Sequence, residues 1–345
     1  MTDVTVVVGA QFGSEGKGAI AAHLTKSWDD HDLAVRVNGP NAGHTAYDAQ
    51  GREWKLRAVP VAAVTSNAQL YVAPGSEVDL QVLLDEVTAL DLAGFNVSRR
   101  LKVHPSATVI EPRHLNAEQA DGLVGRIGST GKGIGAARAD RVMRRATTFG
   151  EVAQDNPPYA TNSYWAKFAA ALDPRDFNNV LVEGTQGYGL GLHTSFYPTV
   201  TSADCRAIDF LAAVGIHPWQ NGTNVRVVVV ARVYPIRVAG NSGPLHGETS
   251  WEALGLPVER TTVTQKVRRV GEWDESLVEE ALAANGHDGG DLVTLALTML
   301  DQKYPEVSDS RELTDEADEF VRELENRLDC YVEFVGTGPA TVVER

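Results

Sequence analysis

The sequence predicts an α/β protein with a wrapped, mostly parallel central sheet. Short β-branched runs are typical of buried strands, and helical patterns lie between them. The first run passes directly into a glycine-rich segment, as in P-loop-NTPase-like folds. Because strands that alternate with helices form parallel sheets, we expect ligands at the carboxyl ends of the strands.

Five runs are predicted to be strands: residues 4–8, 70–73, 180–182, 225–233 and 292–297. Four stretches are predicted to be helices: residues 80–92, 164–172, 277–284 and 314–328. The last stretch has apolar residues at helical spacing, so we interpret its acidic residues as a solvated face. The single candidate linker, residues 155–162, separates stretches with the same α/β pattern, and we therefore expect residues 1–345 to form one domain.

Composition limits the classes of partner. With 31 Lys+Arg against 46 Asp+Glu the net charge is −15, which argues against nucleic-acid polymers and membrane surfaces, although a locally basic pocket can hold a single nucleotide. No run reaches roughly 18 apolar residues and the N-terminus lacks a signal-peptide pattern, so we expect a soluble, cytoplasmic protein. Cys205 and Cys330 have no CxxC partner and are predicted to be buried thiols.

The first motif is the segment GAQFGSEGKG at residues 9–18, between a predicted strand and a helix start at residues 19–24. Its glycines let backbone N–H groups close around phosphate oxygens, Lys17 adds positive charge, and the helix N-terminus adds its dipole. The strict Walker pattern is not met, because Gln11 and Gly18 replace its first glycine and its Ser/Thr. The segment alone therefore fits either a phosphate loop or a glycine-rich turn.

Further motifs follow: NAGHT at 41–45, IGSTGKGIG at 127–135, EGTQG at 183–187, YPTVT at 197–201, TVTQKVRRVG at 262–271, TMLD at 298–301 and GTGP at 336–339. Together with the loop, and in this order, they resemble the signature segments of adenylosuccinate synthetases. The resemblance spans nearly the whole chain and implies that family's fold and its two-step reaction. In that reaction the γ-phosphoryl group of a nucleoside triphosphate is placed on the purine six-position oxygen, and the amine of L-aspartate then displaces it.

The resemblance also implies site residues. Triphosphate-binding residues would be Ser14, Glu15, Gly16, Lys17, Gly18, Gly43, His44, Thr45, Asp301, Gly336, Gly338 and Pro339. Purine monophosphate-binding residues would be Ser14, Asn41, Ser129, Thr130, Arg144, Gln186 and Thr201. Aspartate-binding residues would be Val263, Thr264, Lys266, Arg268 and Arg269. Mg²⁺ would be held by Ser14 and Gly43, and the catalytic residues would be Ser14, His44 and Gln186.

Ser14 departs from the family, which usually carries aspartate there to withdraw the purine N1 proton and help hold Mg²⁺. A serine is shorter, and its oxygen can accept a hydrogen bond from the 2-amino group that guanylate has and inosinate lacks. A bacteriophage branch of the family carries this serine and condenses dGMP with L-aspartate to N6-succino-2-amino-2′-deoxyadenylate, a precursor of 2-aminoadenine in DNA. Such a relative would work in the host cytoplasm. Ser14 through a water, or Glu15, remains open as the group that takes the N1 proton.

Three more expectations follow from the resemblance. Lys266 replaces an arginine that reaches the ribose 2′-hydroxyl, which favours a deoxyribose substrate or reflects neutral drift. Asp301 favours GTP as donor, whereas Met299 in place of a lysine and the guanylate branch favour ATP or dATP. Arg144 falls where the family supplies an arginine to the other subunit, which implies a homodimer.

Other readings stay open from the sequence. The chain fits an ordinary adenylosuccinate synthetase that uses IMP, aspartate and GTP. A P-loop NTPase switch or a nucleoside kinase would share the phosphate loop and Mg²⁺, but neither predicts the NAGHT segment or the pairing of Gln186 with Thr201. Ser14 also fits a paralogue that binds nucleotide without turnover.

Overall fold

The computed structural model describes residues 1–154, 163–261 and 265–345. Within these ranges one nine-stranded sheet has the order β15-β14-β13-β10-β1-β9-β2-β5-β7. Its strands are β1 Thr2–Gly9, β2 Leu33–Arg36, β5 Gln69–Val72, β7 Leu101–Val103, β9 Asn179–Glu183, β10 Thr223–Arg232, β13 Val293–Thr298, β14 Val332–Gly336 and β15 Val342–Glu344. Only β15 runs antiparallel to its neighbour in this sheet. The predicted α/β fold with a mostly parallel central sheet is confirmed.

Smaller elements surround the sheet. The described α-helices are α1 Lys17–Leu24, α2 Ala62–Thr65, α3 Leu80–Leu92, α4 Val97–Arg100, α5 Pro112–Ala120, α6 Leu123–Ile127, α7 Ile134–Val142, α8 Phe149–Ala153, α9 Ser163–Ala166, α10 Ala207–Val214, α11 Glu275–Ala284 and α12 Asp315–Leu328. The strand pairs are β3 His44–Tyr47 with β4 Glu53–Leu56, β6 Glu77–Val78 with β8 Thr108–Val109, and β11 Ile236–Arg237 with β12 Arg269–Val270. The 3₁₀ helices are η1 Pro174–Asp176, η2 Tyr188–Leu190, η3 Leu300–Gln302 and η4 Pro305–Val307.

Local chemistry explains where two predicted helices begin. Asp79 caps α3 by accepting hydrogen bonds from the amides of Gln81 and Val82. Thr314 caps α12 in the same way through the amide of Ala317. Both helices and all five predicted strands are confirmed, with ends that shift by a few residues at most.

One predicted helix, residues 164–172, is wrong for most of its length. The helix α9 ends at Ala166, and the following backbone pairs with β7 instead. The amide of Val103 donates to the carbonyl of Phe168 at 2.9 Å, and the amide of Ala170 donates to the carbonyl of Val103 at 3.1 Å. The apolar spacing was that of a helix, but the edge of the sheet offered these backbone groups other partners. The candidate linker at 155–162 lies outside the described residues.

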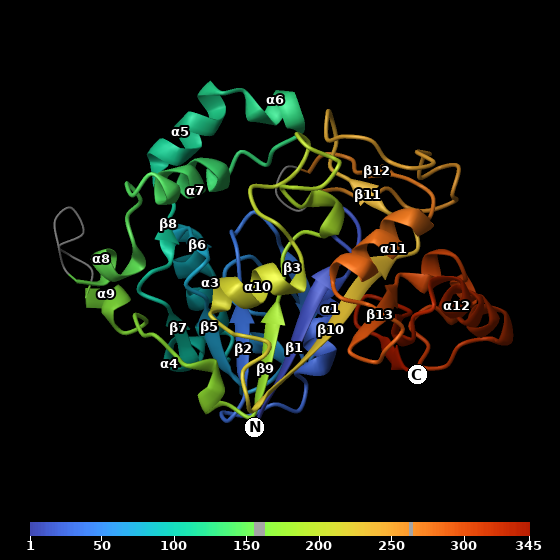
Figure 1. Cartoon of the computed structure of the whole chain (residues 1–345), viewed down its shortest axis with the longest axis horizontal. Coiled ribbons are helices and arrows are strands. Elements are labelled where there is room, and N and C mark those ends of the chain that lie inside the picture. Colours follow the sequence, from blue (N-terminus) through green and yellow to red (C-terminus); the bar gives the residue numbers. More distant parts are fainter. Residues whose placement is uncertain (155–162, 262–264) are drawn as a thin grey trace.

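The sheet is buried on both faces. Along β1 the side chains of Val4, Val6 and Val8 enter one core, while Val7 enters the other. Helices α10, α11 and α12 contribute to the first core, and α1, α2 and α3 to the second. Figure 1 shows α10 and α11 in front of the sheet. Burial on both faces explains why the central strands are runs of valine instead of alternating patterns.

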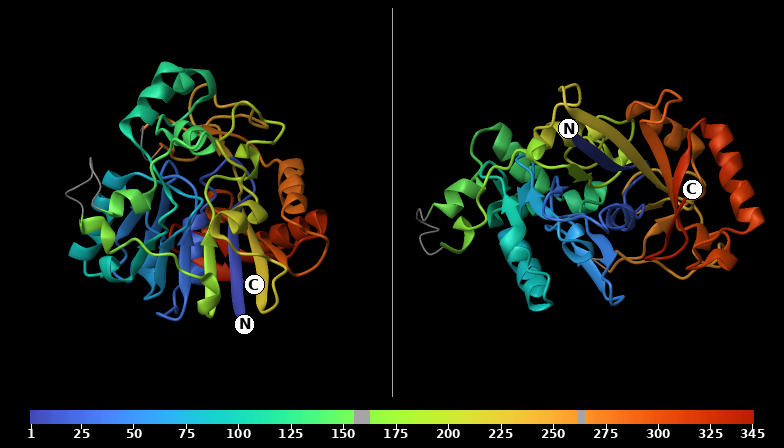
Figure 2. Two further views of the ribbon diagram at one scale, coloured as in Figure 1. Left: turned by 60° about the vertical axis from the view of Figure 1, so that its left-hand side comes forward. Right: turned by 90° about the horizontal axis from the view of Figure 1, so that it is seen from below.

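An arm made of α5, α6 and α7 stands above the carboxyl ends of the strands (Figures 1 and 2). The loops that follow β1, β2, β9, β10, β13 and β14 open toward the same end, which is where ligands were expected. Cys205 and Cys330 are buried free thiols as predicted, and burial raises the pKa of each to about 12. Among the described helices, each is too short or too polar to cross a membrane.

Candidate active site

One cavity of about 970 Å³ lies at the carboxyl ends of the strands. It collects most of the predicted site residues: Ser14, Glu15, Gly16, Lys17, Gly18, Asn41, Gly43, His44, Thr45, Ser129, Thr130, Gln186, Thr201, Lys266, Arg268, Asp301, Gly336, Gly338 and Pro339. Arg144 and Arg269 are not on its wall. Val263 and Thr264 lie outside the described residues. Segments from residue 14 to residue 339 therefore meet in one space.

The phosphate loop joins β1 to α1. Helix α1 begins at Lys17, and Gly16 before it has a φ of 87°, a left-handed conformation that favours glycine. Nζ of Lys17 donates to Oε2 of Glu15 at 2.5 Å and to the carbonyl of Gln186. The loop, the helix N-terminus and a buried ammonium group thus converge, which is the geometry that binds phosphates.

Glu15 supports this loop from inside. Its side chain is fully buried, and Oε1 accepts from the amides of Gln11 at 3.1 Å and Gly13 at 2.7 Å. A methyl group on Gly9 would lie 2.6 Å from Oε2 of Glu15, and one on Gly187 would lie 2.2 Å from Oε1. Because both oxygens are engaged and the surrounding glycines enclose them, the carboxylate of Glu15 is poorly placed to take a proton from a ligand.

The departure from the Walker pattern at Gly18 has a steric reason. A methyl group there would lie 2.6 Å from the carbonyl oxygen of Thr45 and 3.0 Å from Cβ of His44. The first turn of α1 packs directly against β3, which carries His44. A serine or threonine at position 18 would separate these two parts of the site.

Ser14 stands at the exposed side of the loop, with a φ of 59°. Its carbonyl accepts from Arg232 at 3.4 Å. This left-handed conformation is uncommon for residues other than glycine and asparagine or aspartate. The loop therefore holds Ser14 on the cavity wall through its backbone, and its hydroxyl makes no hydrogen bond to the described residues.

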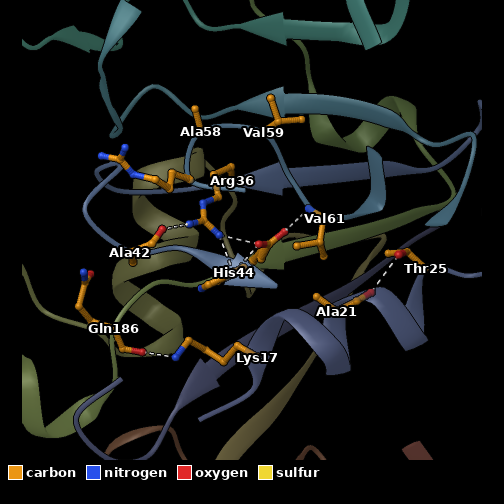
Figure 3. A network of polar contacts seen from close by, with 12 residues as sticks. Lys17, Ala21, Thr25, Arg36, Ala42, His44, Ala58, Val59, Val61 and Gln186 are labelled. Atoms are coloured by element: carbon orange, nitrogen blue, oxygen red, sulfur yellow. Dashed lines mark hydrogen bonds and ion pairs between the residues drawn. The ribbon is translucent and has the colours of Figure 1, made fainter. Parts of the chain in front are cut away.

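His44 lies in a buried polar network (Figure 3). Its Nδ1 contacts Oε1 of Glu183, and NH1 of Arg36 at 2.6 Å. Arg36 also donates to Oε1 of Glu183 at 2.5 Å and to the carbonyl of Ala42 at 2.7 Å, while Oε2 of Glu183 accepts from the amide of Val61 at 2.9 Å. Since Nδ1 is engaged, Nε2 is the ring nitrogen left for a ligand.

The network keeps His44 neutral. Burial and the nearby charge of Arg36 lower the pKa of His44 to about 4, against the opposing effect of Glu183. Burial alone would raise the pKa of Glu183, but Arg36 and His44 outweigh it and lower that pKa to about 2. At neutral pH the site therefore holds a neutral imidazole beside a charged carboxylate–guanidinium pair.

Three buried charged residues in the site were missed by sequence reasoning. Arg36, Glu183 and Arg232 each close a strand of the central sheet, and each is at most 1 % exposed. Arg36 and Glu183 are register partners on β2 and β9. A charged residue at the end of an apolar run was the available signal, because such a residue needs a buried partner at the carboxyl end of the sheet.

The predicted purine side of the cavity is lined by amides and hydroxyls. Nε2 of Gln186 donates to Oδ1 of Asn41 at 3.3 Å, and Gln186 has a left-handed φ of 56°. Ser129 and Thr130 lie in the loop before α7, where Oγ of Ser129 accepts from the amide of Gly131 at 3.1 Å. Thr201 lines the opposite wall. This set offers donors and acceptors suited to a base and a phosphate.

The predicted aspartate side contains a cluster of charged residues. Arg232 donates to both oxygens of Glu259, at 3.1 and 2.5 Å, and Arg268 donates to Oε2 of the same carboxylate at 3.4 Å. Arg269 lies beside the cavity, where it binds Glu248 at 2.5 Å and the carbonyl of Gly243 at 2.7 Å. Two guanidinium groups therefore share the single carboxylate of Glu259. Their positive charge is only partly neutralised, so the cluster can bind a second carboxylate.

Arg237 is another site residue that the sequence did not reveal. It is 1 % exposed, and its guanidinium lies 4.0 Å from the ring centre of Phe12 in the phosphate loop. It donates to the carbonyls of Thr199 at 2.8 Å and Pro244 at 3.0 Å. Arg237 thereby fastens the phosphate loop to the segment that carries Thr201.

Another part of the cavity wall contains Asp301 in η3, Gly336 at the end of β14, and Gly338 just after that strand. Burial and the neighbouring Asp309 raise the pKa of the Asp301 carboxyl. A methyl group on Gly338 would lie 2.0 Å from Oδ1 of Asp309, so glycine permits this close approach. This part of the cavity wall therefore offers a carboxylate that can accept hydrogen bonds from the N–H groups of a base.

The wall of the cavity is locally basic. Its described residues include Lys17, Arg237, Lys266 and Arg268 as cations. Its anions are Glu15, Glu118 and Asp301. The chain as a whole has an acidic excess of 15 charges, so the cavity reverses the sign of the protein around it.

For Mg²⁺ the site offers the hydroxyl of Ser14 and the carbonyl of Gly43, both oxygen donors on the cavity wall. Elsewhere in the described chain, clustered candidate ligands occur only at the exposed residues Asp29, Asp30 and His31. Mg²⁺ commonly keeps waters and binds substrate phosphates together with few protein oxygens. The donor set therefore fits an ion that arrives on a triphosphate.

Comparison with known proteins gives consistent matches. The family model described as adenylosuccinate synthetase matches residues 6–173 and 164–307. The adenylosuccinate synthetase of Pyrococcus sp. (strain ST700) is 38% identical over 341 residues, covering 97% of this chain and 95% of the relative. The N6-succino-2-amino-2′-deoxyadenylate synthase of Vibrio phage phiVC8 is 37% identical over 294 residues, covering 82% of each protein.

Two solved structures share the fold. The succinoaminodeoxyadenylate synthetase of cyanophage S-2L, bound to dGMP and to dATP as an energy donor, superposes with a TM-score of 0.79 at 28% identity, covering 100% of this chain and 95% of that one. Adenylosuccinate synthetase from Plasmodium falciparum superposes with a TM-score of 0.83 at 20% identity, covering 99% of both chains. The second match concerns the fold alone.

Proposed function

The chain belongs to the adenylosuccinate synthetase family, and from this premise we propose that it condenses dGMP with L-aspartate to N6-succino-2-amino-2′-deoxyadenylate. It is a C–N-forming ligase by family, and the proposal concerns its substrate. The reaction would consume a nucleoside triphosphate and pass through a 6-phosphoryl purine. The product would supply 2-aminoadenine for DNA synthesis in the host cytoplasm of a virus.

Ser14 is the observation that carries this proposal. It stands on the exposed side of the phosphate loop and on the wall of the same cavity as Asn41 and Gln186, the predicted partners of the purine. A short hydroxyl there leaves space for a 2-amino group and can accept a hydrogen bond from it. The similarity to two phage enzymes named for this reaction supports the same substrate.

The residues would divide the chemistry between positioning and charge stabilisation. Lys17, the loop amides and the N-terminus of α1 would hold the triphosphate, and Mg²⁺ bound with it at Ser14 and Gly43 would neutralise phosphate charge. Asn41 and Gln186 would hold the purine so that its six-position oxygen attacks the γ-phosphorus. A P–O bond to the purine forms as the bond between the γ-phosphorus and the β-phosphate oxygen breaks, and the nucleoside diphosphate leaves. The neutral His44 would meet the transferring group through Nε2.

In the second step the amine of aspartate attacks C6 of the purine, and the C–O bond to phosphate breaks. Arg268 and Lys266 line the cavity and would bind the aspartate carboxylates. The family resemblance assigns Arg269, Val263 and Thr264 to the same substrate. The N1 proton would already have left in the first step, through Ser14 and a water, as the six-position oxygen attacked the γ-phosphorus, since the carboxylate of Glu15 is engaged by the loop amides and Lys17. Lys266 in place of a bidentate arginine supports a deoxyribose substrate.

For the donor we propose ATP or dATP, in line with the dATP bound to the cyanophage enzyme. Asp301 keeps GTP as the alternative, because a carboxylate can accept two N–H groups from guanine. The base would lie between Asp301 and the segment of Gly336, Gly338 and Pro339.

We also propose a homodimer in which Arg144 serves the partner's site. Arg144 is exposed, has a left-handed φ of 60°, and lies off the wall of its own cavity. Its NH1 donates to the carbonyl of Val142 at 2.6 Å. An exposed arginine just after the C-terminal end of α7, off the wall of its own cavity, is available to a second copy of the chain.

The deciding experiment is phosphate release with Mg²⁺, L-aspartate and ATP, dATP or GTP, offering dGMP and IMP in parallel and identifying the product by mass. Aspartate-dependent consumption of dGMP is the expected result. Turnover of IMP alone would make this an ordinary adenylosuccinate synthetase, which the archaeal relatives favour. Triphosphate hydrolysis that ignores aspartate would instead support a switch, and phosphorylation of a nucleoside would support a kinase.

A further inference from the structure

Asn38 lies between β2 and Asn41, and its backbone adopts a left-handed φ of 64°. Its side chain is 9 % exposed and does not line the cavity. Asparagine tolerates this conformation better than most residues, because its short amide can bond locally. Here the side-chain amide bonds to segments that are distant in sequence, so Asn38 connects separate parts of the fold.

Both ends of the Asn38 amide are engaged across the fold. Nδ2 donates to Oγ1 of Thr185 at 3.0 Å, and Oδ1 accepts from NH2 of Arg138 at 2.9 Å. Thr185 is fully buried and directly precedes Gln186. Arg138 belongs to α7 and is also paired with Glu77 at 2.8 Å. One side chain thus links the loop of Asn41, the loop of Gln186 and the arm.

The neighbouring residue strengthens this joint. A methyl group on Gly39 would lie 2.5 Å from Cδ1 of Ile134, the first residue of α7. The loop before Asn41 therefore packs directly on the start of the helix that follows Ser129 and Thr130. Any shift of the Asn38 amide would move these parts relative to one another, because they share this contact.

We propose that Asn38 is a positioning residue for the purine monophosphate, which sets the separation between Asn41, Gln186 and the loop before α7. The inference rests on the proposed function, since those residues are the predicted partners of the base and phosphate. Asn38 is uncharged, so its removal changes geometry without changing the field in the cavity. Its loss should therefore weaken binding of the monophosphate and leave the donor triphosphate unaffected.

Two variants test this link. N38G keeps the left-handed backbone and removes both side-chain hydrogen bonds, and T185V removes the bond between Asn38 and Thr185 from its other end. The matched control is N96G, which makes the same change at an exposed asparagine with a φ of 52° and a single bond to the carbonyl of Gly94.

The measurements are calorimetric Kd values for dGMP and IMP, and KM values for the monophosphate, aspartate and triphosphate. A neutral hydrogen bond is worth about a twofold to tenfold change in an equilibrium constant. We expect N38G to raise Kd and KM of the monophosphate about tenfold, and T185V about threefold, with KM of the triphosphate unchanged. The double variant N38G/T185V should have the same Kd and KM for the monophosphate as N38G, because N38G alone already removes the hydrogen bond between Asn38 and Thr185.

Equal values for N38G, N96G and the wild type would overturn the inference. A parallel loss for all three substrates with a lower Tm would overturn it too, since a general packing defect predicts that pattern. If the wild type binds neither dGMP nor IMP, the proposed function itself fails. Normal binding and turnover in the wild type with unaffected variants would remove only the role of Asn38.

Discussion

The burial of His44 makes a quantitative prediction about stability and pH. Its pKa is lowered from 6.5 to about 4 in the folded protein by burial and by Arg36. Because the pKa of His44 is lower in the folded protein, the unfolded chain takes up the proton first as the pH falls. The contribution of neutral His44 to the free energy of unfolding is therefore fully present above pH 6.5 and is lost as the pH falls toward 4. Protonation linkage then gives a loss of about 2 kcal/mol between pH 7.5 and 5 from this one residue.

The assay compares urea unfolding of the wild type and of H44Q between pH 7.5 and 5. Glutamine keeps an amide that can hydrogen-bond Glu183 but does not titrate, so carboxylates elsewhere contribute equally to both proteins. We expect the difference in free energy of unfolding between the two proteins to shrink by about 2 kcal/mol over that range. Parallel curves would refute the reasoning, because they would mean that His44 titrates alike in the folded and unfolded chain.

Three further predictions concern activity. S14D should lower the ratio of kcat/KM for dGMP to kcat/KM for IMP by about tenfold or more, because the longer carboxylate occupies the space of the 2-amino group. An unchanged ratio would show that Ser14 does not determine which purine is used. K17M should reduce kcat/KM for the triphosphate by about 100-fold in phosphate-release assays, since the loop loses its buried cation, and near-normal kinetics would contradict the phosphate-loop assignment. R144A and H44Q, each inactive alone, should recover about a quarter of wild-type activity when mixed and reassembled, because half the dimers would carry one complete site. No recovery on mixing would argue against an arginine shared between subunits.

The sequence was sufficient for those features that depend on local pattern. The valine runs and the phosphate loop each have a short-range signal, and of the site residues that the resemblance implies, those within the described residues line one cavity except Arg144 and Arg269. The roles assigned to those motif residues remain predictions, as does the single-domain organisation. The structure shows where these residues lie, and binding experiments are needed to show what they bind.

The rest depended on contacts between distant segments. Arg36 meets Glu183 across 147 positions of sequence, and His44 meets the same carboxylate across 139. Residues 164–172 have helical spacing but partly pair with β7. In each case the partner that decided the outcome lies too far along the chain for a local pattern to reveal it.

The strand order has a consequence for synthesis on the ribosome. The strand β1 lies between β9 and β10, so both of its neighbours are translated at least 170 residues after it. A nascent chain therefore carries an apolar, β-prone segment with Val4 and Val6 to Val8 before either of the strands that pair with it has been made. Emergence of β9 from the exit tunnel would be the earliest point at which the centre of the sheet can close. Until then the segment is a candidate site for a chaperone, and its non-local pairing predicts slow refolding of the released chain.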